Sequence, residues 1–496
     1  MACAKQASVE DSSRPPTLEQ RLRDAEARAA ESDRDQALDR LHLASLALAA
    51  GDPELAERAL RPAVLSMQDF RADGQFAAVV GAERQKEWKG EPYEKMAAFW
   101  MLGTLLHAHG DHGNALAMGK SALLADTGTR LERFQADFVP AFVLKAAAFQ
   151  ALGETHNAER AIDEAIHAWT TRRMIAELTS QLEPIEQKST ESAVHAAKAL
   201  LLSGLPAGVD KHPRDPVAAV NGALAHATAL RQVSLQSKRA ERPVELRSLS
   251  RRELTRAFEE LGRLAKKWES RASALPPDLL ADVDADSAAL RALQEDPSLL
   301  LFITRGRGPE KVNAGRYGEI LRLVPRRPAP SPTVTLDGQS IRPQLLDSIS
   351  WQATTRGGRA VDGFLGGKAV FKDASVGIGY SLMVAGDVAN ATDVPELAAA
   401  AYIAGALTWI AGALTNPEAD TRAWTEIPDE IYLVAADPTP GTHTLTIDGR
   451  RYTVDIPDDD TIVHLVPNLQ PWGADAFGAP CTACEAPLAI PSGGKP

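Results

Sequence analysis

The sequence predicts an α+β protein in which a helical repeat domain, an α-solenoid, precedes an α+β domain with an antiparallel β-sheet. Apolar residues recur with helical period, interrupted by glycine turns, up to about residue 298. Beyond that point, turn residues separate short runs of alternating apolar residues, in segments 430–437, 442–449, 451–457 and 461–467. The 496 residues are enough for two or three domains.

Changes of composition divide the chain into four regions. Residues 1–35 are expected to form a tether and a charged helix, and residues 36–298 the helical domain. In the third region, 299–475, a proline-rich connector leads into the strand-like segments of the α+β domain. Residues 476–496 are a proline- and glycine-rich tail.

Three segments of the helical region share a glycine that follows an apolar helical run, with an alanine five residues later. Glycine can end the first helix in a left-handed conformation at little steric cost, and the small alanine lets the second helix pack closely against the first. This register resembles the tetratricopeptide repeat (TPR), although spacings of 59 and 43 residues make these repeats irregular. The pairs are Gly51 and Ala56, Gly110 and Ala115, and Gly153 and Ala158.

Three motifs, in this order, carry a wider resemblance. They are "EWKGEPYEKM" (87–96), "GRGPEKV" (306–312) and "EADTRAWTEIP" (418–428). Over residues 40–455 the chain is similar to a family of uncharacterised bacterial envelope lipoproteins with "KGxxYE" and "ADTRxWxxLP" motifs, although Ile427 replaces the usual leucine. The matching positions are Lys89, Gly90, Tyr93, Glu94, Ala419, Asp420, Thr421, Arg422, Trp424 and Pro428.

The resemblance implies a periplasm-facing, lipid-anchored protein with a scaffold or assembly role. Members of that family are sometimes encoded near lipoproteins that resemble the curli-type secretion pore, which implies protein partners among envelope secretion or assembly lipoproteins. Cys3 follows a small residue and precedes a polar stretch, as at the start of a mature lipoprotein, and is the lipidation candidate. The apolar part of a lipoprotein signal is absent, so a cytoplasmic location is the alternative.

Composition excludes some classes of function. A net charge of −12 argues against a nucleic-acid partner, because phosphate is bound through concentrated Lys and Arg. Cys481 and Cys484 form one CxxC without a second pair, so we expect a local disulfide or no role, and no zinc site. The uncharged segment 397–415 is rich in alanine and has capping residues, which favours a buried helix over a membrane span.

No catalytic motif is complete, so we expect no catalytic residue, cofactor or metal. The segment "HAHGDH" (107–112) places three histidines and Asp111 on an inter-helix turn, where helix spacing directs His107 and His109 apart. The glycine-rich segment 376–387 lacks the last glycine of a dinucleotide fingerprint. Asp420 and Arg422 are the pair that most resembles a functional site. We interpret them as fixing a loop in preference to binding a polar ligand.

Three functions remain open from the sequence. The first is a non-catalytic protein-interaction scaffold of the cell envelope that binds a protein through its TPR-like half. The second is an envelope hydrolase or glycan-processing enzyme in the 300–475 region, which needs converging carboxylates, or a histidine beside Asp420 or the run 458–460. The third is a cytosolic TPR adaptor, which differs from the first only in location.

Overall fold

The computed structural model describes residues 18–32, 34–68, 87–126, 136–186, 250–272, 287–314, 320–355, 419–458 and 461–467. Several sequence predictions lie outside these residues: the lipidation candidate Cys3, the pair Cys481 and Cys484, and segments 376–387 and 397–415. Among the described helices, none has the length and apolar character needed to cross a bilayer.

The protein is α+β, as predicted, with helices in its first half and sheets later. Residues expected to form a charged helix at the start do form α1. The helices are α1 (Leu18–Glu31), α2 (Gln36–Ala50), α3 (Pro53–Gln68), α5 (Pro92–Ala108), α6 (His112–Ala125), α7 (Val139–Ala151), α8 (Thr155–Glu186), α11 (Arg251–Ala272), α13 (Ala288–Ala292) and α14 (Ile349–Thr355), with a 3-10 turn η6 (Leu293–Glu295).

Three helix hairpins occur where the sequence places the repeat glycines. Gly51, Gly110 and Gly153 have φ of +79°, +79° and +74°, the left-handed conformation that ends α2, α5 and α7. The next helix of each hairpin, α3, α6 or α8, packs against the one before it. The two helices of each hairpin pack closely beside the turn because a small, buried alanine lies there: Ala56, Ala115 or Ala158.

The strands build three sheets, and the strand-like runs of the sequence all appear in them. Sheet A has the order β10-β1-β7-β6, sheet C the order β5-β4-β8-β9, and β2 and β3 form a separate hairpin. The strands are β1 (Leu299–Arg305), β2 (Glu310–Ala314), β3 (Ile320–Val324), β4 (Val334–Leu336), β5 (Gln339–Ile341), β6 (Gln344–Ser348), β7 (Glu430–Ala436), β8 (Gly441–Ile447), β9 (Arg450–Ile456) and β10 (Ile462–Val466).

Sheet A differs from the predicted antiparallel sheet in one pairing. β10 lies parallel to β1, with Leu299 opposite Ile462, whereas β7 is antiparallel to both β1 and β6. A parallel neighbour requires a long return connection between the two strands, and the chain between β1 and β10 supplies one. Alternation in a sequence indicates strands, but it does not indicate the direction of their neighbours.

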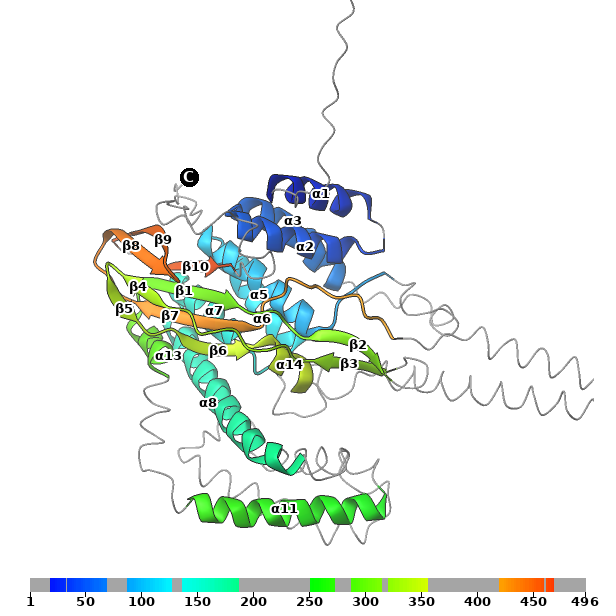
Figure 1. Cartoon of the computed structure of the whole chain (residues 1–496). Coiled ribbons are helices and arrows are strands. Elements are labelled where there is room, and N and C mark those ends of the chain that lie inside the picture. Colours follow the sequence, from blue (N-terminus) through cyan, green and yellow to red (C-terminus); the bar gives the residue numbers. More distant parts are fainter. Residues whose placement is uncertain are drawn as a thin grey trace, which may run out of the picture.

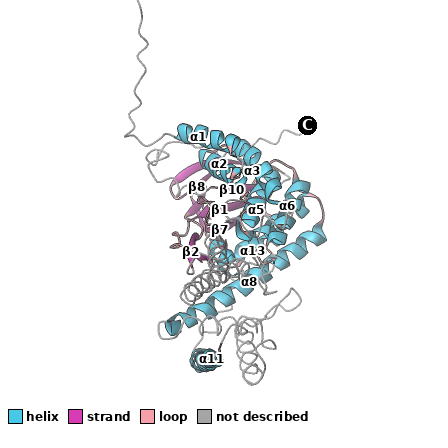
Figure 2. Ribbon diagram, turned by 90° about the vertical axis from the view of Figure 1, so that its right-hand side faces the viewer, coloured by secondary structure: helices cyan, strands magenta, loops and turns pink. Residues whose placement is uncertain are grey.

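Sheet A is the middle of three layers (Figure 1). Along β1, Leu300 and Phe302 belong to the core shared with the helices, whereas Leu299, Leu301 and Ile303 belong to the core shared with sheet C. Strand geometry explains this division, because successive side chains point to opposite faces. Viewed from the side, α5 and α6 lie on one side of the strands (Figure 2).

Helix α5 lies against sheet A at the centre of the helical layer. Its residues are apolar on nearly all sides, and the ring of Trp100 makes edge-to-face contacts with Phe138, 6.1 Å away, and with Phe302 of β1, 5.4 Å away. One core therefore runs across the predicted boundary at residues 298 and 299. That boundary marks a change of secondary structure within a continuous core.

Candidate functional site

The three sequence motifs meet at a buried ion pair between the helical layer and the β2–β3 hairpin. Glu94 lies in the first turn of α5 and Lys311 on β2, and their side chains are 0% and 2% exposed. Lys311 Nζ donates to Glu94 Oε2 over 2.7 Å. Glu94 Oε2 also accepts the backbone N–H of Glu91 at 2.7 Å, in a capping box that starts α5 at Pro92.

The loop carrying the "ADTRxW" motif closes over this ion pair. The backbone N–H of Trp424 donates to Glu94 Oε1 over 3.0 Å. The carbonyl oxygen of Arg422 accepts from Lys311 Nζ at 2.9 Å and from Trp88 Nε1 at 3.2 Å. We call the set Trp88, Glu94, Lys311, Arg422 and Trp424 the motif junction. It joins segments that are hundreds of residues apart in the sequence.

The side chain of Arg422 fixes the same loop. Its Nε and Nη2 donate to Asp420 over 3.0 and 2.6 Å, and its Nη1 donates to Asp35 over 2.5 Å. Burial alone raises the pKa of Asp420 and lowers that of Arg422, but the hydrogen bonds between them reverse both shifts: the pKa of Asp420 lies below, and that of Arg422 above, its ordinary value. The pair is thus held charged, and its geometry agrees with the loop-fixing interpretation.

The remaining motif residues support the junction. Tyr93 and Trp88 are buried, and Lys311 Nζ lies 5.8 Å from the centroid of each ring, within cation–π range. Lys89 donates to the carbonyl of Ser66 at the end of α3, over 3.3 Å. Thr421 lies partly buried in the loop. Residues 88–93, which precede and begin α5, therefore pack onto the helices.

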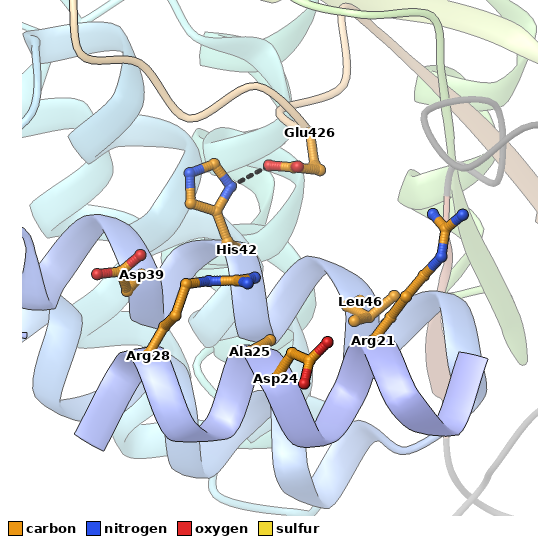
Figure 3. A pocket seen from close by; sticks show the side chains of 8 residues that line it. All are labelled: Arg21, Asp24, Ala25, Arg28, Asp39, His42, Leu46 and Glu426. Carbon is orange, nitrogen blue, oxygen red and sulfur yellow. Dashed lines mark hydrogen bonds and ion pairs between the residues drawn. The ribbon is translucent and has the colours of Figure 1, made fainter. Parts of the chain in front are cut away.

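A polar pocket of about 470 Å³ lies beside the junction, between α1, α2 and the same loop. Figure 3 shows its lining, which comes from α1, α2 and the segment after Trp424. The connection to the junction is direct, because Trp424 Nε1 donates to Ser45 Oγ of α2 over 2.8 Å. The lining residues are Arg21, Asp24, Ala25, Arg28, Asp39, His42, Leu46 and Glu426.

One wall of this pocket is an imidazole held by a carboxylate. His42 Nδ1 contacts Glu426 Oε2, and both side chains are largely buried. Burial alone raises the pKa of Glu426, but the hydrogen bonds from His42 and Thr425 hold it below its ordinary value. The ring is thus oriented with its other nitrogen, Nε2, away from Glu426, as Figure 3 shows. An imidazole held in this way is suited to accept or donate a proton, or to hydrogen-bond a ligand.

A second group of buried charges joins the start of α7 to sheet A. Asp347 of β6 is 0% exposed; its Oδ1 lies 2.9 Å from Arg172 Nη1 of α8, and its Oδ2 accepts the N–H of Val139 over 3.2 Å. Asp137, whose Oδ1 is closed off from solvent, lies near this carboxylate. Burial and the charge of Asp347 raise the pKa of Asp137 to about 8.

His107 and His109 of "HAHGDH" point in different directions, as helix spacing predicts. His107 is buried, with its ring centroid 4.5 Å from that of His112, whereas His109 Nδ1 lies 2.5 Å from Glu57 Oε2 on α3. Asp111 caps α6 by accepting the N–H of Asn114. Within the described part of the chain, no three His, Cys, Asp or Glu side chains converge in a way that could hold a metal ion.

Sequence reasoning singled out the two outer motifs but not their partners. Lys311 and Glu426 were quoted only as parts of "GRGPEKV" and "EADTRAWTEIP", and Ser45 and His42 carried no signal. In the sequence, these contacts correspond only to a single polar residue in an apolar helix, such as Ser45 or His42. Comparisons with protein-family models, with curated proteins and with solved structures find no match to this chain.

Proposed function

We propose that the protein is a non-catalytic scaffold or assembly factor of the bacterial cell envelope that binds a protein partner through a TPR-like helical half. The observation that carries this proposal is the serial packing of the helices. Each of α1, α2, α3, α5, α6, α7 and α8 packs against the next one in this order. Such a row of hairpins presents an extended surface that other helical repeat proteins use for partners.

Two leucines at equivalent repeat positions favour this use of the helices. Leu65 of α3 and Leu124 of α6 are each the fourteenth residue after a hairpin glycine, and they are 66% and 70% exposed. An exposed leucine gains no burial within the protein itself. Its recurrence at the same position of two hairpins therefore supports a surface that another protein covers. In the third hairpin the equivalent residue is His167, which is buried.

The motif junction favours a structural role over catalysis for the residues that resemble the lipoprotein family. Glu94, Lys311 and Arg422 use their charged groups in contacts within the protein. A catalytic carboxylate or lysine needs access to substrate, and Glu94 and Lys311 have almost none. These residues fix the position of the sheets relative to the helical surface.

The partner test uses the full chain with a photo-crosslinker on α3, in cells of the source species. Leu65→Glu and Leu124→Glu together should abolish a specific crosslinked protein, whereas the exposed control substitution Arg23→Glu on α1 should leave it. Crosslinking unchanged in the double variant would contradict a role for this surface.

Location is tested by fractionating the native gene product: membrane recovery that Cys3→Ala abolishes supports the lipid anchor, and recovery in the soluble cytoplasmic fraction supports the cytosolic adaptor.

A hydrolase is the second candidate, because His42 and Glu426 form an oriented imidazole–carboxylate pair in a pocket. In that function His42 Nε2 takes a proton from the water that attacks an ester and gives it to the alkoxide that leaves, and Glu426 stabilises the imidazolium formed in between. A panel of chromogenic carboxylic esters and phosphodiesters tests it. Turnover that His42→Gln abolishes would favour the enzyme, and no turnover by the wild-type chain would remove the candidate.

A further inference from the structure

The α1–α2 pocket carries charges of both signs that have no partner among the described residues. Asp24 and Arg28 are exposed residues of α1, and Asp39 is a partly buried residue of α2. In the described part of the chain, no hydrogen bond or ion pair engages these three side chains. Asp24 and Arg28 have the spacing of four residues at which helical ion pairs form, yet they remain apart. Figure 3 shows them on either side of Ala25.

The balance of charge restricts which ligand the pocket accepts. A simple anion near Arg28 also meets the carboxylates of Asp24 and Asp39, and a simple cation near these carboxylates meets Arg28. Glu426 and Arg21, the other charged residues of the lining, already have contacts within the protein. A ligand that carries separated positive and negative groups satisfies both sets at once, because each of its charges faces an opposite one.

The spacing of the charges sets the length of that ligand. With a rise of 1.5 Å per residue, Asp24 and Arg28 begin about 6 Å apart along the axis of α1. An extended chain spans about 3.3–3.6 Å per residue, so the terminal ammonium and carboxylate of a dipeptide are separated by about this distance. A free amino acid is too short to reach both groups, whereas a volume of about 470 Å³ leaves room for two side chains.

We propose that the pocket binds a short peptide by its two ends, with the ammonium group at Asp24 and the carboxylate at Arg28. The imidazole of His42, held by Glu426, forms the wall against which the peptide lies, and Ala25 and Leu46 form the apolar floor. This site goes beyond the scaffold function, because it binds a small molecule and does not use the exposed leucines of α3 and α6. The two proposals therefore stand or fall separately.

The test is equilibrium dialysis of the purified full-length chain against labelled L-alanyl-L-alanine at pH 7 and low salt. Both ends of this dipeptide are charged at that pH. N-acetylation or C-terminal amidation removes one charge, and each change should weaken binding about tenfold, the effect of one charge-assisted hydrogen bond. Inorganic phosphate, a simple anion, should not displace the peptide.

Variants of exposed residues locate the site without endangering the fold. Arg28→Gln should weaken the binding of the dipeptide but not that of its amide, and Asp24→Asn should weaken the dipeptide but not its acetylated form. Arg23→Gln, on the same helix but outside the pocket lining, is the matched control and should change neither. No binding of the free dipeptide, equal binding of the capped peptides, or an equal effect of Arg23→Gln would overturn the proposal.

Discussion

Glu94 and Lys311 are 217 residues apart in the sequence and form an ion pair that is closed to solvent, with Nζ and Oε2 separated by 2.7 Å. Each partner has further hydrogen bonds: Glu94 accepts from the N–H of Trp424, and Lys311 donates to the carbonyl of Arg422. Hydrogen bonding of this kind is what makes a buried charge tolerable. The pair therefore connects α5, β2 and the "ADTRxW" loop in a single arrangement.

Removing one member of this pair should destabilise the protein strongly. Glu94→Gln leaves the ammonium of Lys311 buried without its counter-charge, and we expect a loss of about 3–5 kcal/mol in the free energy of unfolding, measured in urea. Lys311→Met should cost a similar amount, and the double variant less than the sum of the two. The exposed Glu19–Arg23 pair provides the control, since Glu19→Gln should cost about 0–1 kcal/mol. Additive costs at Glu94 and Lys311 would contradict the pairing.

Replacing Gly90 by alanine should destabilise the protein more than the same change at the hairpin glycine Gly110. Both have positive φ, +73° and +79°, so alanine at either position costs about 1–2 kcal/mol in backbone strain. At Gly90 an added Cβ would also lie 2.7 Å from Met67 Cε and 3.2 Å from Trp88 Cη2, whereas nothing lies within 4 Å of it at Gly110. Gly90→Ala should therefore cost measurably more than Gly110→Ala in urea unfolding. Equal costs would show that the contact with Met67 relaxes freely.

The sequence predicted local features of the fold well, because local residues determine them. The hairpin turns follow from a glycine and a small residue at fixed spacing, and the strands from alternation that buries one or both faces. The parallel neighbour of β1 was not predicted, since its direction depends on the path of a long connection. Nor was the core shared by Trp100 and Phe302, because an apolar residue does not reveal which distant residue it contacts.

The candidate site was predicted only in part, for the same reason. The motif residues Glu94 and Arg422 were identified, but their partners Lys311 and Asp35 were not, since ion pairs between distant segments leave no fixed spacing in one sequence. The α1–α2 pocket depends on how a charged helix lies against an apolar one. The charges of α1 predicted only a charged helix or tether, and only the fold brings His42 and Glu426 together.

Asp137 should make the protein less stable as the pH rises. Burial and the nearby charge of Asp347 raise its pKa to about 8 in the folded state, from an unfolded value of 3.8. Between these values the folded state binds more protons than the unfolded state, so the free energy of unfolding falls from about pH 4 to pH 8 and is then level. Asp137→Asn should reduce this slope and stabilise the protein at pH 8, but not at pH 3; part of the slope should remain, because burial also raises the pKa of Asp347. Urea titrations at several pH values measure both; an unchanged slope would contradict the raised pKa.

His464 should have the opposite effect of pH, on the acid side. It lies on β10 between Val463 and Leu465, which face the helices, so its own side chain faces sheet C, and it is 5% exposed. Burial lowers its pKa to about 4 from 6.5. Below pH 6.5 the unfolded chain binds a proton that the folded chain does not, so the free energy of unfolding decreases as the pH falls from 6.5 to 4.

Replacing His464 by leucine should remove this decrease. His464→Leu places an apolar side chain of similar size in the core between the two sheets, and leucine has no group to protonate. We therefore expect unfolding free energies that differ little from the wild type at pH 7 and exceed it at pH 4.5. Val463→Leu on the same strand is the control, because it changes packing toward the helices without altering the number of protons bound. If His464→Leu lost stability with acid as steeply as the wild type, another group would be responsible, and His464 would be solvated in the folded protein.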